Sequence, residues 1–341
     1  MKFQILFEKG DRHDATIHYI EIIKKSLLNF GVKVEIIETV KEIDSKKNII
    51  VVVNAKAHLK VLLKNPFIKV ICWYQGIMPE EIFINYHKRD KSLKIALWTI
   101  FEFVSLKLNF FSIFVSNKMK RHYELKYRVN FNNRFYVMPC FNLDIDEKAF
   151  KYPNKFTNPT FLYAGTMSDW QCIDQMLILY SEIESRLPNS KLFLFTPDKK
   201  RAKEYIKKYR IENVLIDYKP YKELSQEIKK YKYGFIIRED IEMNRVATPT
   251  KMNTYLANGI IPIFSNCIDS FKENLSNLKF KIVLDNNVDS KFLLEKLNEF
   301  ESNEELQNSI YNDFLVNAFE SYYNNKFHIK ELYKKLNETI Y

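Results

Sequence analysis

The chain has 341 residues, of which 46% are hydrophobic and 28% are charged, so it is long enough for two domains that each bury a core. This balance excludes a disordered or fibrous protein. The four cysteines lie far apart and form no Cys-x-x-Cys pair, which argues against a zinc site and against a disulfide framework. Cysteine usage of this kind is expected in a reducing cytoplasm.

The net charge of +11 is unevenly distributed along the chain. Residues 1–150 contain 25 Lys and Arg against 16 Asp and Glu, a net charge of +9, whereas residues 151–341 contain 28 against 26, a net charge of +2. Residues 87–134 alone carry 11 basic and 3 acidic residues, a net charge of +8. A local excess of this size attracts phosphates, whether they belong to nucleic acid, lipid headgroups or a phosphorylated substrate.

The first half of the chain alternates apolar runs with helix-length amphipathic stretches. Its first run is too short for a signal peptide and is expected to be a strand. The predicted strands are Lys2–Glu8, Val32–Glu38, Asn48–Val53, Ile68–Trp73, Ser112–Ser116 and Phe135–Met138. The predicted helices include Thr16–Asn29 and Leu93–Asn109. The longest nearly uncharged run, Ile95–Leu106, falls short of the roughly 20 residues of a membrane-spanning helix, so we expect none.

The alternation lapses between Pro139 and Pro159, a stretch with three prolines and several Asn and Asp residues, and then restarts. The predicted strands of the second half are Thr160–Ala164, Lys191–Phe195, Asn213–Asp217, Tyr233–Ile237, Ile260–Phe264 and Lys281–Leu284. Helical patterns such as Lys199–Tyr209 and Lys222–Tyr231 separate them, and Leu306–Leu336 is expected to be helical as well.

Apolar strands separated by helices indicate parallel sheets covered on both faces. We therefore predict an α/β protein of two Rossmann-like, doubly wound domains that face a central cleft. The expected organisation is an N-terminal domain over 1–145, a linker over 146–159, a second domain over 160–315 and a C-terminal helix over 316–341 that packs back toward the first domain. In such sheets ligands bind at the carboxyl ends of the strands.

The stretch from Tyr233 to Phe264 reads as a strand, a polar loop, a helix, a glycine stop and another strand. Thr248 or Thr250 can cap the helix, and Pro249 suits its first turn. A helix N-terminus that follows a strand can hold a phosphate, and the nearby Arg238 and Lys251 have the charge to neutralise a diphosphate. An ordinary loop with a surface lysine is the alternative.

This stretch resembles the donor-site signature of GT-B glycosyltransferases of the family 4 type. The matching residues are Arg238, Asn244, Pro249, Thr250, Lys251, Tyr255, Leu256, Ala257, Gly259 and Pro262. The chain departs from the family at Thr254, where the family usually has the glutamate that grips the nucleotide ribose, and near Val246, where its other acidic position falls. Glu239, Asp240 and Glu242 lie upstream and are candidate substitutes.

Two further stretches are similar to parts of the same family. Thr160–Leu177 resembles the first strand-turn-helix of the family's C-terminal domain, with a Gly-x-x-x-x-Trp-Gln pattern that begins at Gly165. Ile71–Glu81 resembles a Gln-Gly-x-x-Pro-Glu-Glu loop of capsule- and lipopolysaccharide-type transferases. The resemblance implies a donor site made of Gly165, Thr166, Trp170, Arg238, Glu239, Asn244, Thr248, Pro249, Thr250, Lys251 and Thr254.

The acceptor is expected in the N-terminal half, where the loop Lys9–Asp14 follows the first strand. His13 and Asp14 are candidates to orient an acceptor hydroxyl or take its proton, although Asp14 is equally suited to cap the next helix. The acceptor candidates are Arg12, His13, Asp14, Gln75, Gly76 and Glu80, and the catalytic candidates are His13, Arg238 and Lys251.

The basic stretch 87–134 combines bulky apolar residues with lysines. A core helix is one interpretation of Lys94–Leu108. The other is a face that binds anionic lipid, where a lipid-linked acceptor would be found, so that a cytoplasmic protein sits peripherally on the inner face of the cell membrane. No nucleic-acid-binding motif is recognisable, and we do not expect nucleic acid as a partner.

The resemblance implies a hexosyltransferase-like enzyme of polysaccharide biosynthesis. It would move a sugar from a nucleotide-sugar to a hydroxyl of a cell-surface glycan or lipid-linked acceptor, with retention of configuration and without a metal or other cofactor. The absent glutamate at Thr254 keeps open a non-catalytic scaffold subunit of a glycan-assembly complex. A polyol-phosphate transferase or an epimerase of the same fold is a further alternative.

Overall fold

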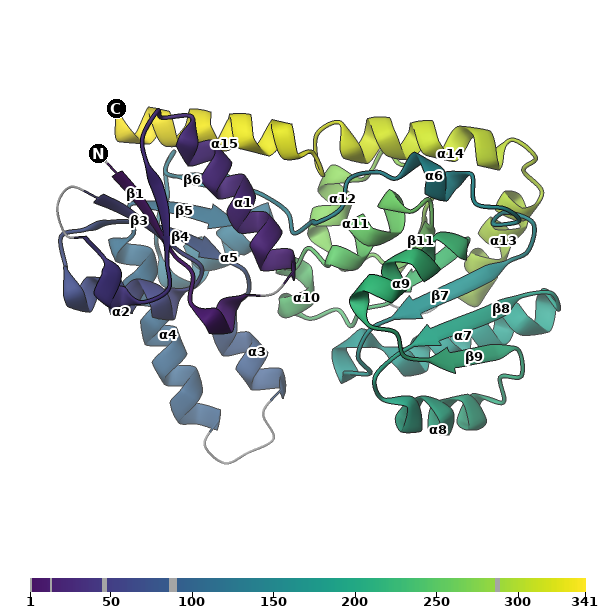
Figure 1. Cartoon of the computed structure of the whole chain (residues 1–341). Coiled ribbons are helices and arrows are strands. Elements are labelled where there is room, and N and C mark those ends of the chain that lie inside the picture. The colour runs from purple at the N-terminus through teal and green to yellow at the C-terminus, as the bar shows by residue number, and fades with distance from the viewer. Residues whose placement is uncertain (1, 13, 45–47, 86–90, 286–288) are drawn as a thin grey trace. The chain divides into compact units, whose positions relative to one another are not determined.

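A computed structural model describes residues 2–12, 14–44, 48–85, 91–285 and 289–341 (Figure 1). The chain divides into two compact units. Unit 1 comprises residues 1–142, 245–248 and 321–341, and unit 2 comprises residues 143–244 and 249–320. Each unit contains one six-stranded sheet in which all pairs of neighbouring strands are parallel.

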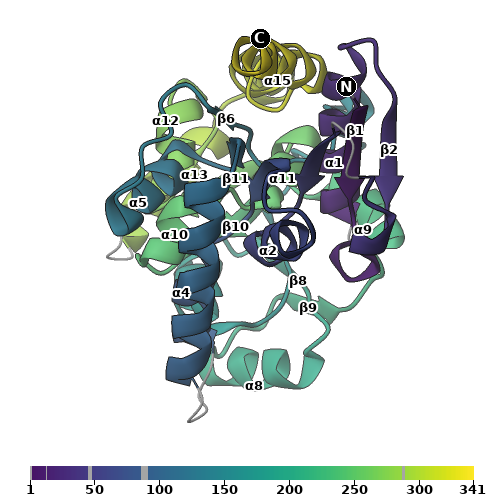
Figure 2. The ribbon, with the colours of Figure 1, turned by 90° about the vertical axis from the view of Figure 1, so that its left-hand side faces the viewer.

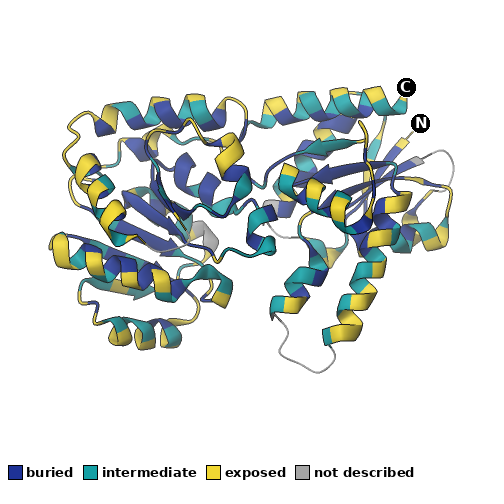
Figure 3. Ribbon diagram, turned by 180° about the vertical axis from the view of Figure 1, so that it is seen from behind, coloured by how far each residue is buried: buried dark blue, intermediate teal, exposed yellow. Residues whose placement is uncertain are grey.

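The sheet of unit 1 has the strand order β2-β1-β3-β4-β5-β6. Its strands are β1 (Lys2–Leu6), β2 (Val34–Ile37), β3 (Asn48–Val52), β4 (Lys69–Tyr74), β5 (Phe111–Phe114) and β6 (Phe135–Val137). The side chains of β3, β4 and β5 are almost wholly apolar and buried, as expected of parallel strands covered on both faces (Figure 3).

The helices of unit 1 are α1 (Asp14–Leu28), α2 (Ala55–Lys64), α3 (Met78–Asn85), α4 (Lys91–Leu108), α5 (Asn117–Tyr127) and α15 (Asn325–Ile340). Asn54 and Ser116 cap α2 and α5, since their side-chain oxygens accept hydrogen bonds from the backbone N–H groups of Ala57 and Met119. Helix α4 extends beyond the sheet of unit 1 (Figure 2). Helix α15 packs on α1, with the rings of Phe30 and Tyr333 centred 4.8 Å apart.

The sheet of unit 2 has the order β12-β11-β10-β7-β8-β9. Its strands are β7 (Thr160–Ala164), β8 (Lys191–Phe195), β9 (Val214–Asp217), β10 (Tyr233–Ile236), β11 (Ile261–Ser265) and β12 (Ile282–Leu284). Its α-helices are α6 (Glu147–Phe150), α7 (Ile173–Arg186), α8 (Lys199–Tyr209), α9 (Tyr221–Glu227), α11 (Thr250–Ala257), α12 (Asp269–Asn274), α13 (Ser290–Glu301) and α14 (Leu306–Phe314), and the short α10 (Glu242–Val246) runs from unit 2 into unit 1.

The structure confirms the predicted fold class and each predicted strand, with ends that differ by at most two residues. Two features differ from the sequence analysis. The short helix α6, capped by Asp146, forms inside the stretch expected to be a plain linker. The stretch Leu306–Leu336, expected to be helical, is interrupted, because α14 passes into a π-helical turn at Leu315–Phe319 and α15 starts anew behind the cap Asn324.

Candidate functional sites

Each sheet has one topological switch point, where the order of the strands reverses. The loops that follow the two strands at this point run in opposite directions and leave a crevice in which ligands bind. In unit 2 this position lies between β7 and β10, because the chain passes from β7 to β8 on one side and returns to β10 on the other. Gly165 follows β7, and Arg238 follows β10 by two residues. The two sequence stretches that resembled a donor site thus meet at one edge of one sheet.

Arg238 is a buried cation without a carboxylate partner among the residues that the structure describes. Its side chain is 9% exposed, and its Nε and one terminal nitrogen are buried without a hydrogen-bond partner. Its backbone N–H donates to Ser265 Oγ at 2.8 Å, which fixes the start of the loop. Burial lowers the pKa of the guanidinium. A buried guanidinium in this state is costly unless an anion occupies the space it faces.

Lys251, in the first turn of α11, brings a second cation to the same place. Its Nζ donates to Gln171 Oε1 at 2.8 Å and lies 4.3 Å from the ring centre of Tyr163. Burial, and then the charge of Arg238, hold the pKa of Lys251 well below its usual range. Neither cation forms an ion pair with a carboxylate in the part of unit 2 that the structure describes. The two cations therefore lie close together without a carboxylate partner among those residues.

Gly165 makes room for this arrangement. Its φ of +153° is a conformation that favours glycine, and a Cβ at this position would lie 2.8 Å from Lys251 Nζ. The N-terminus of α11 adds backbone N–H groups, because Pro249 precedes Thr250 without a side-chain cap. Gly259, with a φ of +68°, ends the helix as predicted.

The other predicted donor residues are distributed around these three. Thr166 is exposed and Trp170 is half-buried, both in the loop after β7. Thr254 Oγ1 donates to the backbone oxygen of Thr250 at 3.1 Å, so it stays bound to its own helix. Glu239 is exposed, and its backbone oxygen accepts from the Asn244 side chain at 2.9 Å. Thr248 belongs to unit 1, where its hydroxyl accepts from the Cys140 N–H at 3.0 Å.

Unit 1 holds a cavity of about 450 Å³ at the equivalent edge of its own sheet. The loops after β1, β3 and β4 contribute Asp11, Asn54 and Gln75, and helices α3 and α4 close the other side with Glu81, Trp98 and Glu102. Strands β1 and β3 are the pair at which this sheet reverses direction. The cavity therefore lies where a doubly wound sheet binds its ligand.

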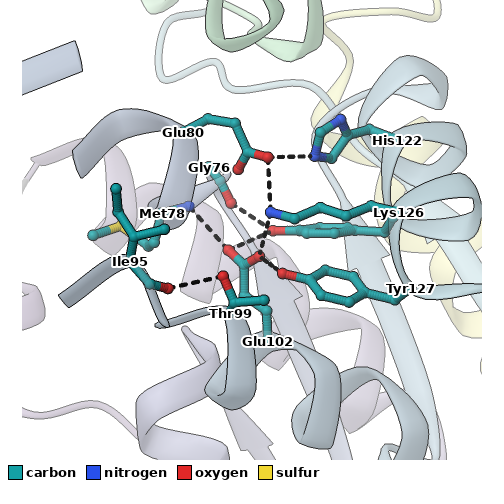
Figure 4. A network of polar contacts seen from close by, with 10 residues as sticks. Gly76, Met78, Glu80, Ile95, Thr99, Glu102, His122, Lys126 and Tyr127 are labelled. Atoms are coloured by element: carbon teal, nitrogen blue, oxygen red, sulfur yellow. Dashed lines mark hydrogen bonds and ion pairs between the residues drawn. The ribbon is translucent and has the colours of Figure 1, made fainter. Parts of the chain in front are cut away.

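Glu102 is the polar centre of the α3–α4 pair (Figure 4). It is 2% exposed, accepts from the Met78 N–H at 2.9 Å and from the Tyr127 hydroxyl at 2.7 Å, and lies 3.7 Å from Lys126 Nζ. Burial raises the pKa of Glu102 to about 7, against the opposing effects of the Tyr127 hydrogen bond and the Lys126 charge. This carboxyl ties the start of α3 to α4 and to α5.

The predicted acceptor residues have different fates in the structure. Gln75 and Gly76 line the cavity, whereas Glu80 does not and instead pairs with Lys126 at 2.7 Å and His122 at 3.3 Å (Figure 4). Arg12 donates to Glu38 Oε1 at 2.8 Å. His13 lies outside the described residues, as does the side chain of Asp14, with which α1 begins. The acceptor-binding role of all six residues stays a prediction.

Among the cavity residues that sequence reasoning missed are Asn54, Trp98 and Glu102. Asn54 directly follows β3, and the rule that pointed to Lys9–Asp14 would have found it too. Glu81 directly follows Glu80, and no sequence feature indicates which of the two carboxylates lines the cavity. Trp98 and Glu102 are on α4, which was read only as a core helix or a lipid-binding face. No group of three or more His, Cys, Asp or Glu side chains that suits a metal occurs among the described residues.

Comparisons with known proteins support the fold. No protein-family model and no curated protein matches the sequence. Sucrose-phosphate synthase from Thermosynechococcus elongatus matches with a TM-score of 0.69 and 11% identity over 99% of both chains. The lipopolysaccharide outer core galactosyltransferase WaaB matches with a TM-score of 0.64 and 12% identity over 100% of this chain and 99% of its own.

A mutant of S. aureus TarM, in complex with Fondaparinux, alpha-GlcNAc-glycerol and UDP, matches with a TM-score of 0.65 and 12% identity. The match covers 86% of this chain and 56% of TarM, so this chain spans about half the length of that protein. At such identities the likeness concerns the fold. The chain has the fold of the GT-B glycosyltransferases, with two parallel-sheet units.

Proposed function

We propose that the protein is a glycosyltransferase that takes its sugar from a nucleoside diphosphate. One observation carries this proposal: Arg238 is buried with unpartnered nitrogens beside Lys251, at the strand edge where α11 begins. A diphosphate carries the negative charge that would neutralise these two cations. The fold shared with glycosyltransferases, and the UDP in the TarM complex, support the same proposal.

The proposed reaction breaks the bond between the anomeric carbon and the phosphate oxygen, and the electron pair leaves with the diphosphate. Arg238 and Lys251 stabilise the negative charge that develops on that oxygen. Electrostatic stabilisation of this kind is usually the largest single contribution to the rate enhancement of an enzyme. The acceptor hydroxyl oxygen bonds to the anomeric carbon, and its proton passes to the departing diphosphate oxygen. We propose retention of configuration on the resemblance to family 4, and we propose that these two cations perform the neutralisation without a metal ion.

We propose further that the acceptor is a glycan or a lipid-linked saccharide, bound by unit 1. His13 stays a candidate for orienting its hydroxyl. The scaffold alternative rests on Thr254, which bonds to its own helix and offers the nucleotide ribose no carboxylate. A scaffold subunit has no need to bind any nucleotide, so nucleotide binding separates the two functions.

Helix α4 supports peripheral binding to an anionic membrane. Leu93, Leu97 and Ile100 share one side of the helix with Phe103 at its border, and each is at least 43% exposed. Lysines 91, 94 and 107 are on the same helix, and its one acidic residue, Glu102, is buried. An exposed apolar stripe flanked by lysines is typical of a surface that binds anionic lipid. No helix among the described residues is long and apolar enough to cross a membrane.

Thermal stabilisation by UDP-, GDP-, CMP- and dTDP-sugars tests the proposal, because a ligand that binds only the folded state raises Tm. We expect one nucleotide class to raise Tm in the wild type and to be turned over when an acceptor extract is added. Arg238→Ala and Lys251→Ala are expected to lose both effects, and Lys203→Ala, at an exposed lysine of α8, serves as the matched control. Stabilisation by none of the nucleotides would contradict the proposal.

A further inference from the structure

The cavity of unit 1 differs in charge from the half of the chain that contains it. Residues 1–150 carry a net charge of +9. The described residues that line the cavity include three carboxyl side chains, Asp11, Glu81 and Glu102, against a single cation, the exposed Lys56. Burial raises the pKa of both Glu81 and Glu102, because the hydrogen bonds and cations around them do not offset the cost of burying the charged form.

The Glu81 carboxylate lies against the loop after β4. A Cβ at Gly76 would fall on the Glu81 carboxylate, so glycine at 76 is required for the carboxylate to lie there. The Gly76 backbone oxygen accepts from the Tyr123 hydroxyl at 2.7 Å, which fixes this loop from the other side. Glu81 is half-buried and lines the cavity, so its carboxylate borders the space where a ligand would lie.

Two amide side chains of the same cavity are held in fixed orientations. Gln75 Nε2 donates to the Val53 backbone oxygen at 3.0 Å. Asn54 accepts from the Ala57 N–H at 2.8 Å and donates to Asp11 Oδ1 at 3.4 Å. Fixed amides and carboxylates are groups that hydrogen-bond to sugar hydroxyls at low entropic cost.

Trp98 supplies an apolar wall to the same cavity. It is half-buried on α4 and meets the edge of Phe101 at a ring distance of 5.8 Å. A sugar presents both an apolar ring face and several hydroxyls, and this cavity offers a partner to each of them. A phosphate or a carboxylate finds no buried cation there among the described residues and meets three acidic groups.

We propose that this cavity binds a neutral or amine-bearing sugar as the acceptor and discriminates against phosphorylated and uronic-acid sugars, with Glu81 as the specificity-determining residue. The proposal rests on the proposed function, which makes this sugar the acceptor. The basic excess of the first half then serves a surface outside the cavity.

The test measures binding of four monosaccharides to the full chain by saturation-transfer NMR titration. The probes are methyl α-glucoside, glucosamine, glucose 6-phosphate and glucuronic acid. We expect glucosamine and methyl α-glucoside to bind at least about tenfold more tightly than the two acidic sugars, since like charges in a half-buried site repel strongly. UDP binding is measured on the same samples.

Glu81→Lys is expected to reduce the ratio of affinities between the non-acidic and the acidic sugars by about tenfold. Glu81→Gln is expected to weaken the binding of glucosamine and to leave the binding of methyl α-glucoside unchanged. Glu21→Lys, on α1 and outside the cavity lining, is the charge-matched control and is expected to keep the wild-type preference. Melting curves of all variants verify folding.

Acidic sugars that bind as well as the neutral ones, or an unchanged preference in folded Glu81→Lys and Glu81→Gln, would overturn the proposal. Normal UDP binding with no response from any monosaccharide would overturn it too, and would leave the donor site intact. Binding of the sugars without binding of any nucleotide would instead remove the proposed function.

Discussion

At the scale of single residues, Gly165 is placed where no other residue fits without displacing Lys251. Gly165→Ala introduces a Cβ 2.8 Å from Lys251 Nζ at a φ of +153°. We expect a loss of about 1–3 kcal/mol in the free energy of unfolding, together with weaker nucleotide binding. Urea unfolding and nucleotide titration measure the two effects.

Gly10→Ala is the matched control for this substitution, because no atom lies within 4 Å of the Cβ that it would add. Equal effects of the two substitutions on nucleotide binding would mean that Gly165 does not shape the anion site.

The buried Glu102 carboxyl predicts a pH dependence of stability. Its pKa is raised to about 7 in the folded protein, so the folded state binds a proton more tightly than the unfolded state does. The contribution of Glu102 to the free energy of unfolding is fully present below its unfolded pKa of about 4.5. It is lost as pH rises through about 7, a change of roughly 3 kcal/mol.

Glu102→Gln is expected to remove this part of the pH dependence. Denaturant unfolding of wild type and variant at pH 5 and pH 8 gives the difference, with Glu295→Gln on α13 of unit 2 as control. If the wild type and Glu102→Gln lose the same free energy between these pH values, the carboxyl does not titrate as described.

At the scale of elements, the apolar stripe of α4 is a surface that the rest of unit 1 does not cover. We expect the protein to co-sediment with vesicles that contain about 30% anionic lipid, and to remain free in vesicles of zwitterionic lipid alone, because the lysines on α4 add electrostatic attraction to apolar contact.

Leu97→Glu combined with Ile100→Glu is expected to abolish vesicle binding while leaving nucleotide binding unchanged. Leu63→Glu is the control, since Leu63 is 88% exposed and belongs to another helix, α2. Equal loss in the control, or binding that survives the double substitution, would exclude α4 as the contact surface.

At the scale of the whole molecule, much of the fold was predictable from the sequence. Parallel strands buried on both faces are continuous apolar runs, and runs such as Asn48–Val53 and Tyr233–Ile237 have one plausible structure. The break between α14 and α15 was not predictable, because Ser321–Asn324 interrupts an otherwise helical pattern without a proline or glycine.

The candidate site of unit 2 was predictable in its residue types, and that of unit 1 only in part. Arg238 and Lys251 are found from a strand end and a helix start that lie close together in the sequence. Trp98 and Glu102 reach their cavity from a helix whose strand neighbours are far away in the sequence, so only the three-dimensional structure brings them to Asn54 and Gln75.

The proposed chemistry also predicts how the whole protein responds to chelation. Because the proposal assigns neutralisation of the diphosphate to Arg238 and Lys251, we expect sugar transfer to persist in EDTA at its rate in added Mg²⁺, within about twofold. Loss of transfer in EDTA and recovery on adding Mg²⁺ would assign part of that neutralisation to a metal ion.

Calorimetric titration of UDP, or of whichever nucleoside diphosphate stabilises the protein, into wild type and Arg238→Ala is the most direct test of the central claim. A charge-assisted contact contributes about 1.5–3 kcal/mol, so Kd is expected to rise by about 10- to 100-fold in Arg238→Ala while Lys203→Ala keeps the wild-type value. Equal affinity of folded wild type and Arg238→Ala would contradict the claim that this buried guanidinium holds the diphosphate.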